Sequence, residues 1–159
     1  MIDQAEFRRV MGHFATGVAV VTSMRDDGTP CGLTANALAS VSLNPTLVLV
    51  CVEKNSDSHR CIAAHGAFAV NVLAEGGGET IARRFATYGV GDKFAGLAFH
   101  AERTGAPVLD EALAWMDCRV TEHLPGGDHT VFLGEVLAAA AVEGTPLLYY
   151  RGGYGRFAP

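Results

Sequence analysis

Two polar clusters interrupt apolar runs in the first third of the chain, and the first lies in GLTANALASVSLNP at 32–45. Thr34, Asn36, Ser40 and Ser42 break an otherwise strand-like run of small residues there. Small side chains let a flat ligand approach the backbone, whose exposed N–H groups can then bond to its heteroatoms. The alternative is the polar edge of a strand that satisfies its own backbone, and the residues alone leave both open.

The second cluster is EKNSDSH at 53–59, between a strand-like run and a short helix signal. A lysine, two serines and a helix N-terminus together predict a site for a small anion, because free N–H groups and the helix dipole favour phosphate. Arg84, from a later helix, offers a bidentate contact to the same anion. The alternative is a solvated turn with a helix cap.

Two later segments carry weaker signals. PGGDH at 125–129 is most simply a hairpin turn, and His129 gains interest only if that turn lies beside the two clusters. In the C-terminal YYRGGYG, Tyr150, Arg151 or Tyr154 could lie at the rim of a pocket, although aromatic residues near a C-terminus usually cover a core. Neither segment decides the function alone.

Several well-known site motifs do not occur in the chain. There is no G-x-x-x-x-G-K-[ST] and no G-x-G-x-x-G between a strand and a helix, so neither common nucleotide-binding fold is indicated. No G-x-S-x-G nucleophile elbow is present. The six histidines form no H-E-x-x-H and no ligand spacing with the cysteines, so the sequence predicts no metal site.

The composition is that of a globular chain with its own core. Of 159 residues, 49% are hydrophobic and 18% are charged, which excludes intrinsic disorder and predicts a single domain over residues 1–159. With 12 basic against 17 acidic residues the net charge is −5, which offers no electrostatic footprint for nucleic acid or an anionic membrane. We therefore expect neither as a partner, although a local basic pocket could hold a small anion.

The N-terminus and the cysteines bear on the compartment. MIDQAEFRRV lacks the apolar run of a secretory signal, and no apolar stretch approaches the roughly 20 residues of a membrane span. Four cysteines, Cys31, Cys51, Cys61 and Cys118, are widely spaced and form no C-x-x-C pair. We expect a cytoplasmic chain with reduced cysteines, some of which act as small buried hydrophobes.

The elements that must position these clusters are mostly strands. A helix is predicted at the N-terminus, with Asp3 as its cap, Glu6 in a capping box and an apolar face at helical spacing (Phe7, Val10, Met11 and Phe14). Asp27-Gly28 predicts a turn that pairs a strand at 18–23 with one at 31–37. Further strands are expected at 46–53, 67–73, 114–123 and 130–142, followed after a break by LLYYRGGY at 147–154.

The helices between these strands are few and short. Ser58 is expected to cap a helix that Gly66 ends, and a second short helix is expected at 79–86. A long irregular stretch then reaches Pro107, which suggests a functional or interface loop. About six strands with regular turn signals predict a mainly β chain with accessory helices, arranged as one antiparallel barrel.

Taken in order, the motifs resemble a known family. They are FRRVMGHFATGVAVVTS (7–23), GLTANALASVSLNPTLVLVCVEKNSDSH (32–59), FAVNVL (68–73), RRFA (83–86), DKFAG (92–96), GDHTVFLGEV (128–136) and LLYYRGGYG (147–155). The chain is similar, from about Phe7 to Gly155, to the short-chain flavin reductases, which are the reductase components of two-component flavin monooxygenases. The order of the motifs is specific, whereas no single motif is.

The resemblance implies a fold and a set of contacts. The fold is a six-stranded antiparallel split β-barrel that binds FMN or FAD without a Rossmann fold, usually as a homodimer. The implied flavin contacts comprise the isoalloxazine edge (Thr34, Ala35, Asn36 and Ala37, with Ser40 and Ser42 close by), the ring and ribityl strand (Cys51, Val52, Glu53 and Lys54), the phosphate loop (Lys54, Asn55, Ser56 and Ser58) and a helix contact (Arg84 and Phe85). His129 is implied as the catalytic residue on the nicotinamide side, and Tyr154 is a second nicotinamide candidate.

The implied reaction is hydride transfer from NADH or NADPH to oxidised FMN or FAD, with the reduced flavin passing to a separate flavin-dependent oxygenase. The cofactor supplies the chemistry and the protein supplies orientation and electrostatics, so no catalytic triad is needed. Three alternatives are a non-catalytic flavin-binding module, an enzyme like pyridoxamine-phosphate oxidase that oxidises an amine with oxygen, and a structural barrel without a ligand.

Overall fold

Strands dominate the computed structural model, which describes residues 1–158. Its helices are α1 (Gln4–Met11), α2 (Asp57–His65) and α3 (Gly77–Ala86). Its strands are β1 (Thr16–Gly17), β2 (Ala19–Met24), β3 (Pro30–Ala35), β4 (Leu38–Leu43), β5 (Thr46–Glu53), β6 (Ala67–Leu73), β7 (Phe99–Ala101), β8 (Pro107–Leu109), β9 (Ala112–Gly126), β10 (His129–Ala141), β11 (Leu147–Tyr150) and β12 (Gly153–Arg156). The prediction of a mainly β chain with few helices is confirmed.

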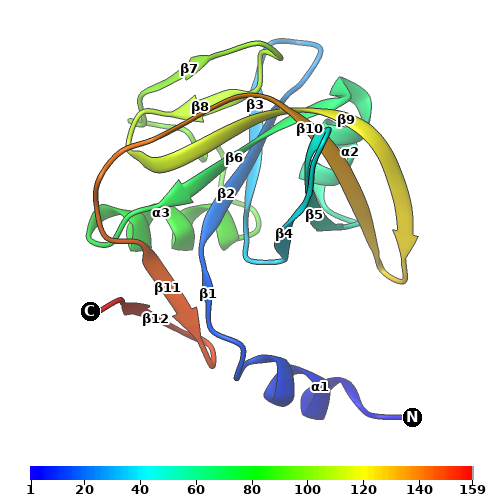
Figure 1. The fold of residues 1–159 in the computed structure, drawn as a ribbon, viewed down its shortest axis with the longest axis vertical. Coiled ribbons are helices and arrows are strands. Elements are labelled where there is room, and N and C mark those ends of the chain that lie inside the picture. The colour runs from blue at the N-terminus through cyan, green and yellow to red at the C-terminus, as the bar shows by residue number, and fades with distance from the viewer. Residues whose placement is uncertain (159) are drawn as a thin grey trace.

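The main sheet is antiparallel and has the strand order β3-β2-β6-β9-β10-β5-β4 (Figure 1). The main sheet alone therefore has seven strands, whereas about six strands were predicted for the barrel. The difference arises at the first polar cluster, because the chain leaves β3 at Asn36 and pairs again as β4 along β5. β3 and β4 are the two ends of this order, so residues 1–158 show an open sheet and not a closed six-stranded barrel.

Two smaller sheets complete the β structure. β1, β11 and β12 form one of them, and β7 pairs with β8 in the other. The stretch predicted to be irregular as far as Pro107 thus contains β7, and the run at 147–154 is a hairpin and not one strand. Arg151 and Gly152 make its turn, both with positive φ (49° and 82°), as tight hairpin turns require.

The core lies against both faces of the main sheet. One cluster, beside α2, contains the buried side chains of Val50, Ile62, Phe68 and Phe132. The other lies under α3 and contains Val20, Leu73, Ile81, Phe85 and Phe94. α2 and α3 are therefore held in place by burial of their apolar faces, which positions the polar ends of both helices.

α1 begins as predicted, since the Asp3 carboxylate accepts a 2.8 Å hydrogen bond from the Glu6 backbone N–H. The capping box is not completed, because the Glu6 carboxylate pairs with Arg9 instead. The helix lies apart from the main sheet in Figure 1. Its predicted apolar face is not covered by residues 1–158: the exposed fractions are 56% (Phe7), 50% (Val10), 50% (Met11) and 71% (Phe14).

α2 begins two residues earlier than predicted. Ser56, and not Ser58, is the N-cap, because the Ser56 hydroxyl accepts a 3.1 Å hydrogen bond from the His59 backbone N–H. Gly66, with φ of 70°, ends the helix as predicted. No helix within residues 1–158 is both long and apolar enough to cross a membrane.

The prediction that all four cysteines are reduced is wrong for two of them. Cys31 of β3 and Cys61 of α2 form a disulfide, whereas Cys51 and Cys118 are free. The two partners are 30 residues apart in sequence and meet only because α2 packs back against β3. Sequence spacing therefore carried no sign of the pairing.

Candidate active site

The fold brings the predicted clusters together at the ends of β3 and β5. The Cys51 backbone N–H donates a 2.9 Å hydrogen bond to the Ala37 carbonyl, which joins the two polar stretches. The Lys54 backbone N–H donates a 3.0 Å hydrogen bond to the Asp128 carbonyl in the β9–β10 turn. His129 is also the register partner of Glu53. The turn that carries His129 therefore lies beside the polar clusters, so His129 remains a candidate site residue.

A cavity of about 330 Å³, here called the α2 cavity, lies at the N-terminus of α2. Its walls are residues 30–34 of β3, residues 56–58 at the start of α2, and residues 85–94 after α3. Thr34 is held at this wall by a hydrogen bond from its hydroxyl to the Ala82 carbonyl. Phe85 is 1% exposed and also lines the cavity, where its ring packs against Phe94 with centroids 5.0 Å apart.

Two further depressions continue from the α2 cavity along the chain after β3. The β3 pocket, about 200 Å³, shares Thr34 and Ala86 with the α2 cavity and also contains Ala35 and Asn36. The α1 groove, about 880 Å³, shares Asn36 with the β3 pocket and continues past Ala37 to Cys51 and the apolar face of α1. These shared residues give one elongated depression, from the start of α2 to α1.

The start of α2 has free hydrogen-bond donors. The backbone N–H groups of Asp57 and Ser58 lie in the first helical turn and have no acceptor within residues 1–158. Ser58 is only 6% exposed and lines the α2 cavity, yet its hydroxyl makes no hydrogen bond to the described chain. Ser56, by contrast, is occupied, since its hydroxyl caps the helix and donates to the Glu53 carbonyl at 2.7 Å. A hydroxyl without a protein partner, beside free N–H groups in a cavity wall, is suited to bind an anion.

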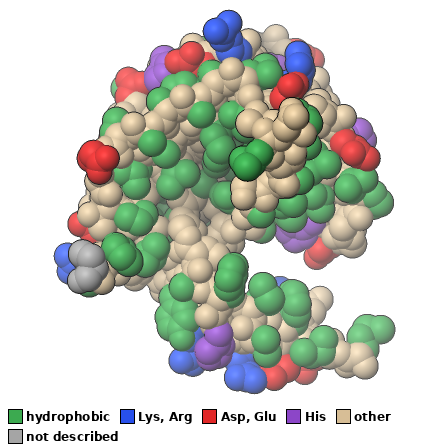
Figure 2. Space-filling model, viewed as in Figure 1, with side chains coloured by type: hydrophobic (Ala, Val, Ile, Leu, Met, Phe, Trp, Pro, Cys, Tyr) green, Lys and Arg blue, Asp and Glu red, His purple; other side chains and the backbone are tan. Residues whose placement is uncertain are grey.

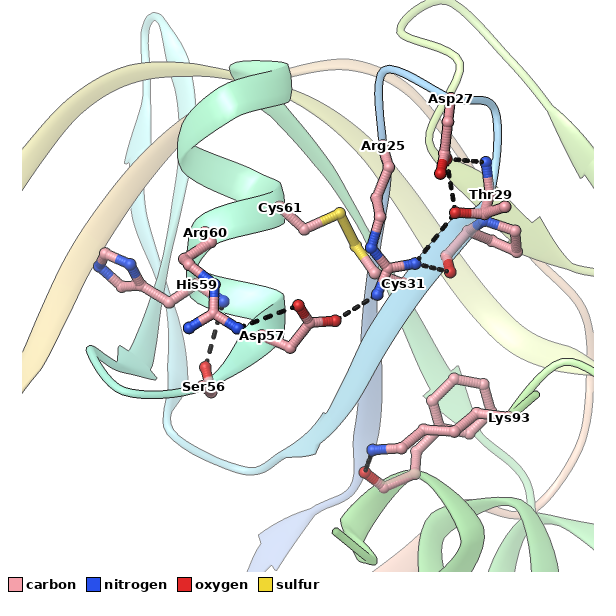
Figure 3. Close-up of polar contacts among 12 residues, drawn as sticks. Arg25, Asp27, Thr29, Cys31, Ser56, Asp57, His59, Arg60, Cys61 and Lys93 are labelled. Carbon is pink, nitrogen blue, oxygen red and sulfur yellow. Dashed lines mark hydrogen bonds and ion pairs between the residues drawn. A yellow bond between two sulfur atoms is a disulfide. The ribbon is translucent and has the colours of Figure 1, made fainter. Parts of the chain in front are cut away.

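An ion-pair chain compensates the acidic residue in this helical turn. Figure 3 shows Arg25 and Arg60 on either side of Asp57. The Arg25 guanidinium, by its hydrogen bond, holds the pKa of the Asp57 carboxyl below its usual value. Because Asp57 is paired with two cations, its charge opposes an incoming anion less than a free carboxylate would.

Lys93 is the cation that faces the α2 cavity from the opposite wall. Its ammonium donates a 2.9 Å hydrogen bond to the Phe85 carbonyl, as seen at the lower right of Figure 3. Burial lowers the pKa of Lys93, with Asp57 acting in the opposite sense. Sequence reasoning gave no role to Arg25 or Lys93. The only signal for Lys93 was its place in DKFAG, a motif without a polar cluster around it.

The predicted cations lie elsewhere. The Lys54 ammonium donates to the Gly127 carbonyl at 2.7 Å and so ties the β9–β10 turn to the end of β5. The Arg84 guanidinium donates to the Ala95 carbonyl at 2.8 Å. Neither residue lines the α2 cavity, and Asn55 does not line it either. Lys54 and Arg84 therefore shape the surroundings of the cavity, and Arg25 and Lys93 supply its positive charge.

Three other predicted residues are placed away from the depression or turned from it. Ser40 and Ser42 lie on the edge strand β4 and line none of the three depressions. Val52 is fully buried in the core, so only its main chain is available to a ligand. Cys51 and Glu53, on the opposite face of β5, line the α1 groove and the α2 cavity respectively.

The histidines beside the site have different environments. His129 is half-buried and its Nδ1 lies 2.8 Å from the Asp128 carboxylate, an interaction that lowers the pKa of Asp128. His59 bonds through Nε2 to the Thr130 hydroxyl at 2.8 Å, and burial lowers its pKa. Glu53 accepts a 2.9 Å hydrogen bond from the Tyr88 hydroxyl, which fastens the segment after α3 across the α2 cavity.

Tyr154 reaches the same depression from the C-terminal hairpin. It lines the β3 pocket, and burial raises the pKa of its hydroxyl. The Arg83 guanidinium lies 4.9 Å from the ring centroid, and the Tyr149 ring packs edge-on at 5.5 Å. Tyr154, for which the sequence evidence was weak, thus lines the same pocket as Thr34 and Asn36.

The depression suits an elongated ligand with an anionic end and a planar body. The anion would lie at the start of α2, against Ser58. The planar part would lie along residues 34–37, where side chains are small and β3, an edge strand, has main-chain groups that no neighbouring strand takes up. Within residues 1–158 no group of three His, Cys, Asp or Glu side chains is placed to hold a metal ion.

Comparison with known proteins identifies the family of the chain. Residues 11–158 match the family model described as flavin reductase like domain. The chain is 46% identical over 158 residues, 99% of this chain and 83% of the relative, to the reductase component of a 4-nitrophenol 4-monooxygenase/4-nitrocatechol 2-monooxygenase from Rhodococcus opacus. It is 44% identical over 165 residues, 99% of this chain and 87% of the relative, to an NADH-dependent FAD reductase from Streptomyces globisporus.

Solved structures show the same similarity. An NADH:FAD oxidoreductase from Streptomyces globisporus, in complex with NAD and FAD fragments, superposes with a TM-score of 0.91 at 43% identity, covering 99% of this chain and 94% of that one. A nitrilotriacetate monooxygenase component B homologue from Mycobacterium thermoresistibile gives a TM-score of 0.93 at 41% identity, with coverage of 99% and 88%.

Proposed function

The chain belongs to the flavin reductase like domain family, and from this premise we propose that it oxidises NADH or NADPH with FMN or FAD as the electron acceptor. The reduced flavin then serves a separate flavin-dependent oxygenase, as the names of its relatives as monooxygenase reductase components indicate for those proteins. The observation that carries the proposal is the continuous depression from the α2 N-terminus to Ala37, which matches a flavin mononucleotide from its phosphate to its ring.

The residues present fit the flavin. The backbone N–H groups of Asp57 and Ser58, with the Ser58 hydroxyl, would hold the phosphate at the helix N-terminus, and Lys93 would add positive charge across the α2 cavity. The main chain at residues 34–37 would bond the edge of the ring. Cys51 and Glu53 lie beside this path, on the outward face of β5.

When bound, the flavin supplies the two-electron chemistry, so the task of the chain is positioning. Main-chain N–H groups along residues 34–37 would stabilise negative charge at the ring edge, because they are fixed before the reaction. Tyr154, in the wall of the β3 pocket, would orient the nicotinamide, and His129 would contact it from the β9–β10 turn. Holding donor and acceptor in register is the main catalytic contribution of these residues.

The direct test is oxidation of NADH and of NADPH, followed with and without added FMN, FAD and riboflavin. We expect turnover that requires a flavin. Nicotinamide oxidation that stays at background with every flavin, together with flavin binding, would identify a non-catalytic flavin-binding module. Oxygen uptake with an amine and no response to NADH would identify a chemistry like that of pyridoxamine-phosphate oxidase. A preparation that binds no flavin in equilibrium dialysis would be a structural barrel.

The uncovered face of α1 supports a homodimer as part of this proposal. Figure 2 shows hydrophobic side chains on α1 and, across a hollow, on the body of the chain. Phe7, Met11 and Phe14 line one side of the α1 groove, and Leu38 and Leu49 line the other. A helix with one apolar face normally buries it, and a patch of this kind rimmed by polar residues marks an interface. We assign the second copy of this chain as the occupant, because a two-fold pair would cover both α1 grooves and close the site at Asn36.

The dimer is tested by analytical ultracentrifugation. Phe14→Ser places a polar group on the uncovered face of α1 and is expected to shift the chain towards monomer and to weaken flavin binding. Val142→Ser is a matched control, because Val142 is similarly exposed (66% against 71% for Phe14) and lines no part of the groove. A wild-type chain that sediments as a monomer while it turns over flavin would contradict the assignment.

The split barrel, the single domain over residues 1–159 and a cytoplasmic location complete the proposal. The barrel is supported by topology, since the two end strands of the main sheet, β3 and β4, are consecutive in the chain and are joined only through Asn36 and Ala37. A sheet whose ends are so joined must curl until those ends approach each other.

A further inference from the structure

The Cys31–Cys61 disulfide closes a loop that contains one part of the candidate site. Cys31 lies on β3, three residues before Thr34, and Cys61 lies one helical turn after Asp57. The covalent loop between them therefore contains two of the stretches that line the depression, 34–37 and 51–58. Whether this loop is closed bears directly on how firmly the start of α2 is held against β3.

The disulfide also forms a wall between two depressions. Cys31 lines the α2 cavity on the inner side. Cys61 lines a separate outer groove of about 350 Å³, together with Arg25, Asp27 and Arg60. Figure 3 shows the disulfide joining α2 to β3 behind the Arg25–Asp57–Arg60 chain. Cys31 and Cys61 are only 4% and 5% exposed, and Cys61 borders the outer groove, which is the side from which a small dithiol would approach.

Charged groups of both signs surround Cys61 on the side of the outer groove. Arg25 and Arg60 both line the outer groove, and guanidinium groups near a cysteine stabilise its thiolate. A sulfur that leaves as a stabilised thiolate leaves faster. Asp26, Asp27 and Asp57 line the same groove, so its carboxylates outnumber its two guanidinium groups and the groove as a whole does not attract an anionic thiolate.

We propose that Cys31–Cys61 is a reversible redox modification site that sets the affinity of the α2 cavity for phosphate-bearing flavins. A dithiol reductant attacks the disulfide, the S–S bond breaks, and a second thiol of the reductant resolves the mixed disulfide. Two electrons and two protons pass to Cys31 and Cys61, which become thiols, while the reductant becomes a disulfide. A chain in a reducing compartment meets such reductants, so both states are accessible.

The disulfide form binds the flavin phosphate more tightly. The donors for the phosphate are the first residues of α2, and with the disulfide closed they are tied covalently to the opposite wall. After reduction, α2 keeps its Ser56 cap, its Gly66 end and the burial of Ile62, so the helix persists. Its N-terminus is then held to the β2–β3 hairpin without a covalent link, by the packing of α2 and by the exposed Arg25–Asp57 pair, and exposed pairs are weak. Loss of preorganisation lowers affinity without removing any contact group.

This inference rests on the proposed function and is tested by flavin titration in two redox states. Free thiols are counted first in the air-purified chain and again after treatment with dithiothreitol. FMN and riboflavin are then titrated into both forms. We expect two additional thiols on reduction, FMN binding weakened by roughly three- to tenfold, riboflavin binding unchanged, and restoration of FMN affinity on reoxidation.

Variants separate the disulfide from other effects of the reductant. Cys31→Ala with Cys61→Ala is expected to bind FMN at the reduced level whether or not dithiothreitol is present. Cys118→Ala, which removes a thiol outside the pair, is expected to keep the full response. Near-UV circular dichroism confirms that the reduced wild-type chain is folded.

The results that would overturn the redox site differ from those that would overturn the reductase proposal. Equal FMN affinity in the two states, the absence of a disulfide in the air-purified chain, or unfolding of the chain on reduction overturns the redox site and leaves the reductase proposal standing. Absence of flavin binding in both states overturns the reductase proposal and the redox site together.

Discussion

Replacing Ser58 by alanine tests the phosphate site with little disturbance of the fold. Ser58 is 6% exposed, lines the α2 cavity and has no hydrogen-bond partner for its hydroxyl within residues 1–158. Removing that hydroxyl therefore leaves no protein group unsatisfied. We expect the free energy of unfolding of Ser58→Ala to change by less than about 0.5 kcal/mol, because the substitution opens no large cavity, buries no unpaired polar group and removes no helix cap.

The effect on the ligand is expected to be much larger. A hydrogen bond to a charged group contributes about 1.5–3 kcal/mol, which corresponds to a roughly 10- to 150-fold increase in the dissociation constant of FMN. Riboflavin lacks the phosphate, so its affinity should stay within about twofold of wild type. Isothermal titration calorimetry or flavin fluorescence with both ligands measures the difference directly.

Ser56→Ala provides the contrast. Ser56 caps α2, so its loss is expected to lower the free energy of unfolding by about 1 kcal/mol, whereas Ser58→Ala leaves it unchanged. Equal losses of FMN and riboflavin affinity in Ser58→Ala, or no loss of either, would refute the assignment of the α2 N-terminus to the phosphate.

Three other predictions concern the surroundings of the site. His129→Ala should raise the KM for NADH or NADPH and leave flavin affinity nearly unchanged in steady-state kinetics and titration; the reverse pattern would remove His129 from the donor side. Reducing Cys31–Cys61, which closes a loop with a sequence separation of 30, should lower the free energy of unfolding in urea by about 3–4 kcal/mol, and no change would show that the denatured state is unaffected. Burial lowers the pKa of His59 in the folded chain below its usual value of 6.5. Between the folded pKa and 6.5 the unfolded state therefore binds more protons than the folded state, so the free energy of unfolding should fall as the pH drops through this range. His59→Gln should reduce the pH dependence of the free energy of unfolding, measured by urea titrations on either side of pH 6.5. If the pH dependence is the same in the variant, another group causes it.

Local signals predicted those parts of the fold that depend on a few neighbouring residues. Asp3 as the cap of α1 and Gly66 as the end of α2 were both predictable, because each acts within one helical turn. The choice between Ser56 and Ser58 was not, since both serines precede the same apolar run. The structure assigns the cap to Ser56 and leaves Ser58 free, which makes Ser58 the better ligand residue.

Features that depend on distant parts of the chain were beyond sequence reasoning. The apolar spacing of Phe7 and Phe14 indicates a buried face, but the described residues do not cover it. Lys93 reaches the α2 cavity from an irregular segment whose path no periodicity describes. Lys54, chosen as a cation within the polar cluster, and Arg84, chosen as a cation from a later helix, donate to carbonyl groups of neighbouring loops instead.

The break between β3 and β4 explains why the candidate site lies where it does. Along β5, side chains alternate, so Val50 and Val52 enter the core while Cys51 and Glu53 face the depression. Such alternation can place side chains at a site, but a flat ligand also needs main-chain groups that no strand has taken. Such free main-chain groups occur at Asn36–Ala37, where the chain leaves β3 at one end of the main sheet and begins β4 at the other. In the described chain, the only backbone hydrogen bond between Asn36–Ala37 and β5 is the one that the Cys51 N–H donates to the Ala37 carbonyl. The small residues there are required by the split itself, because larger ones would fill the gap that a ring edge needs.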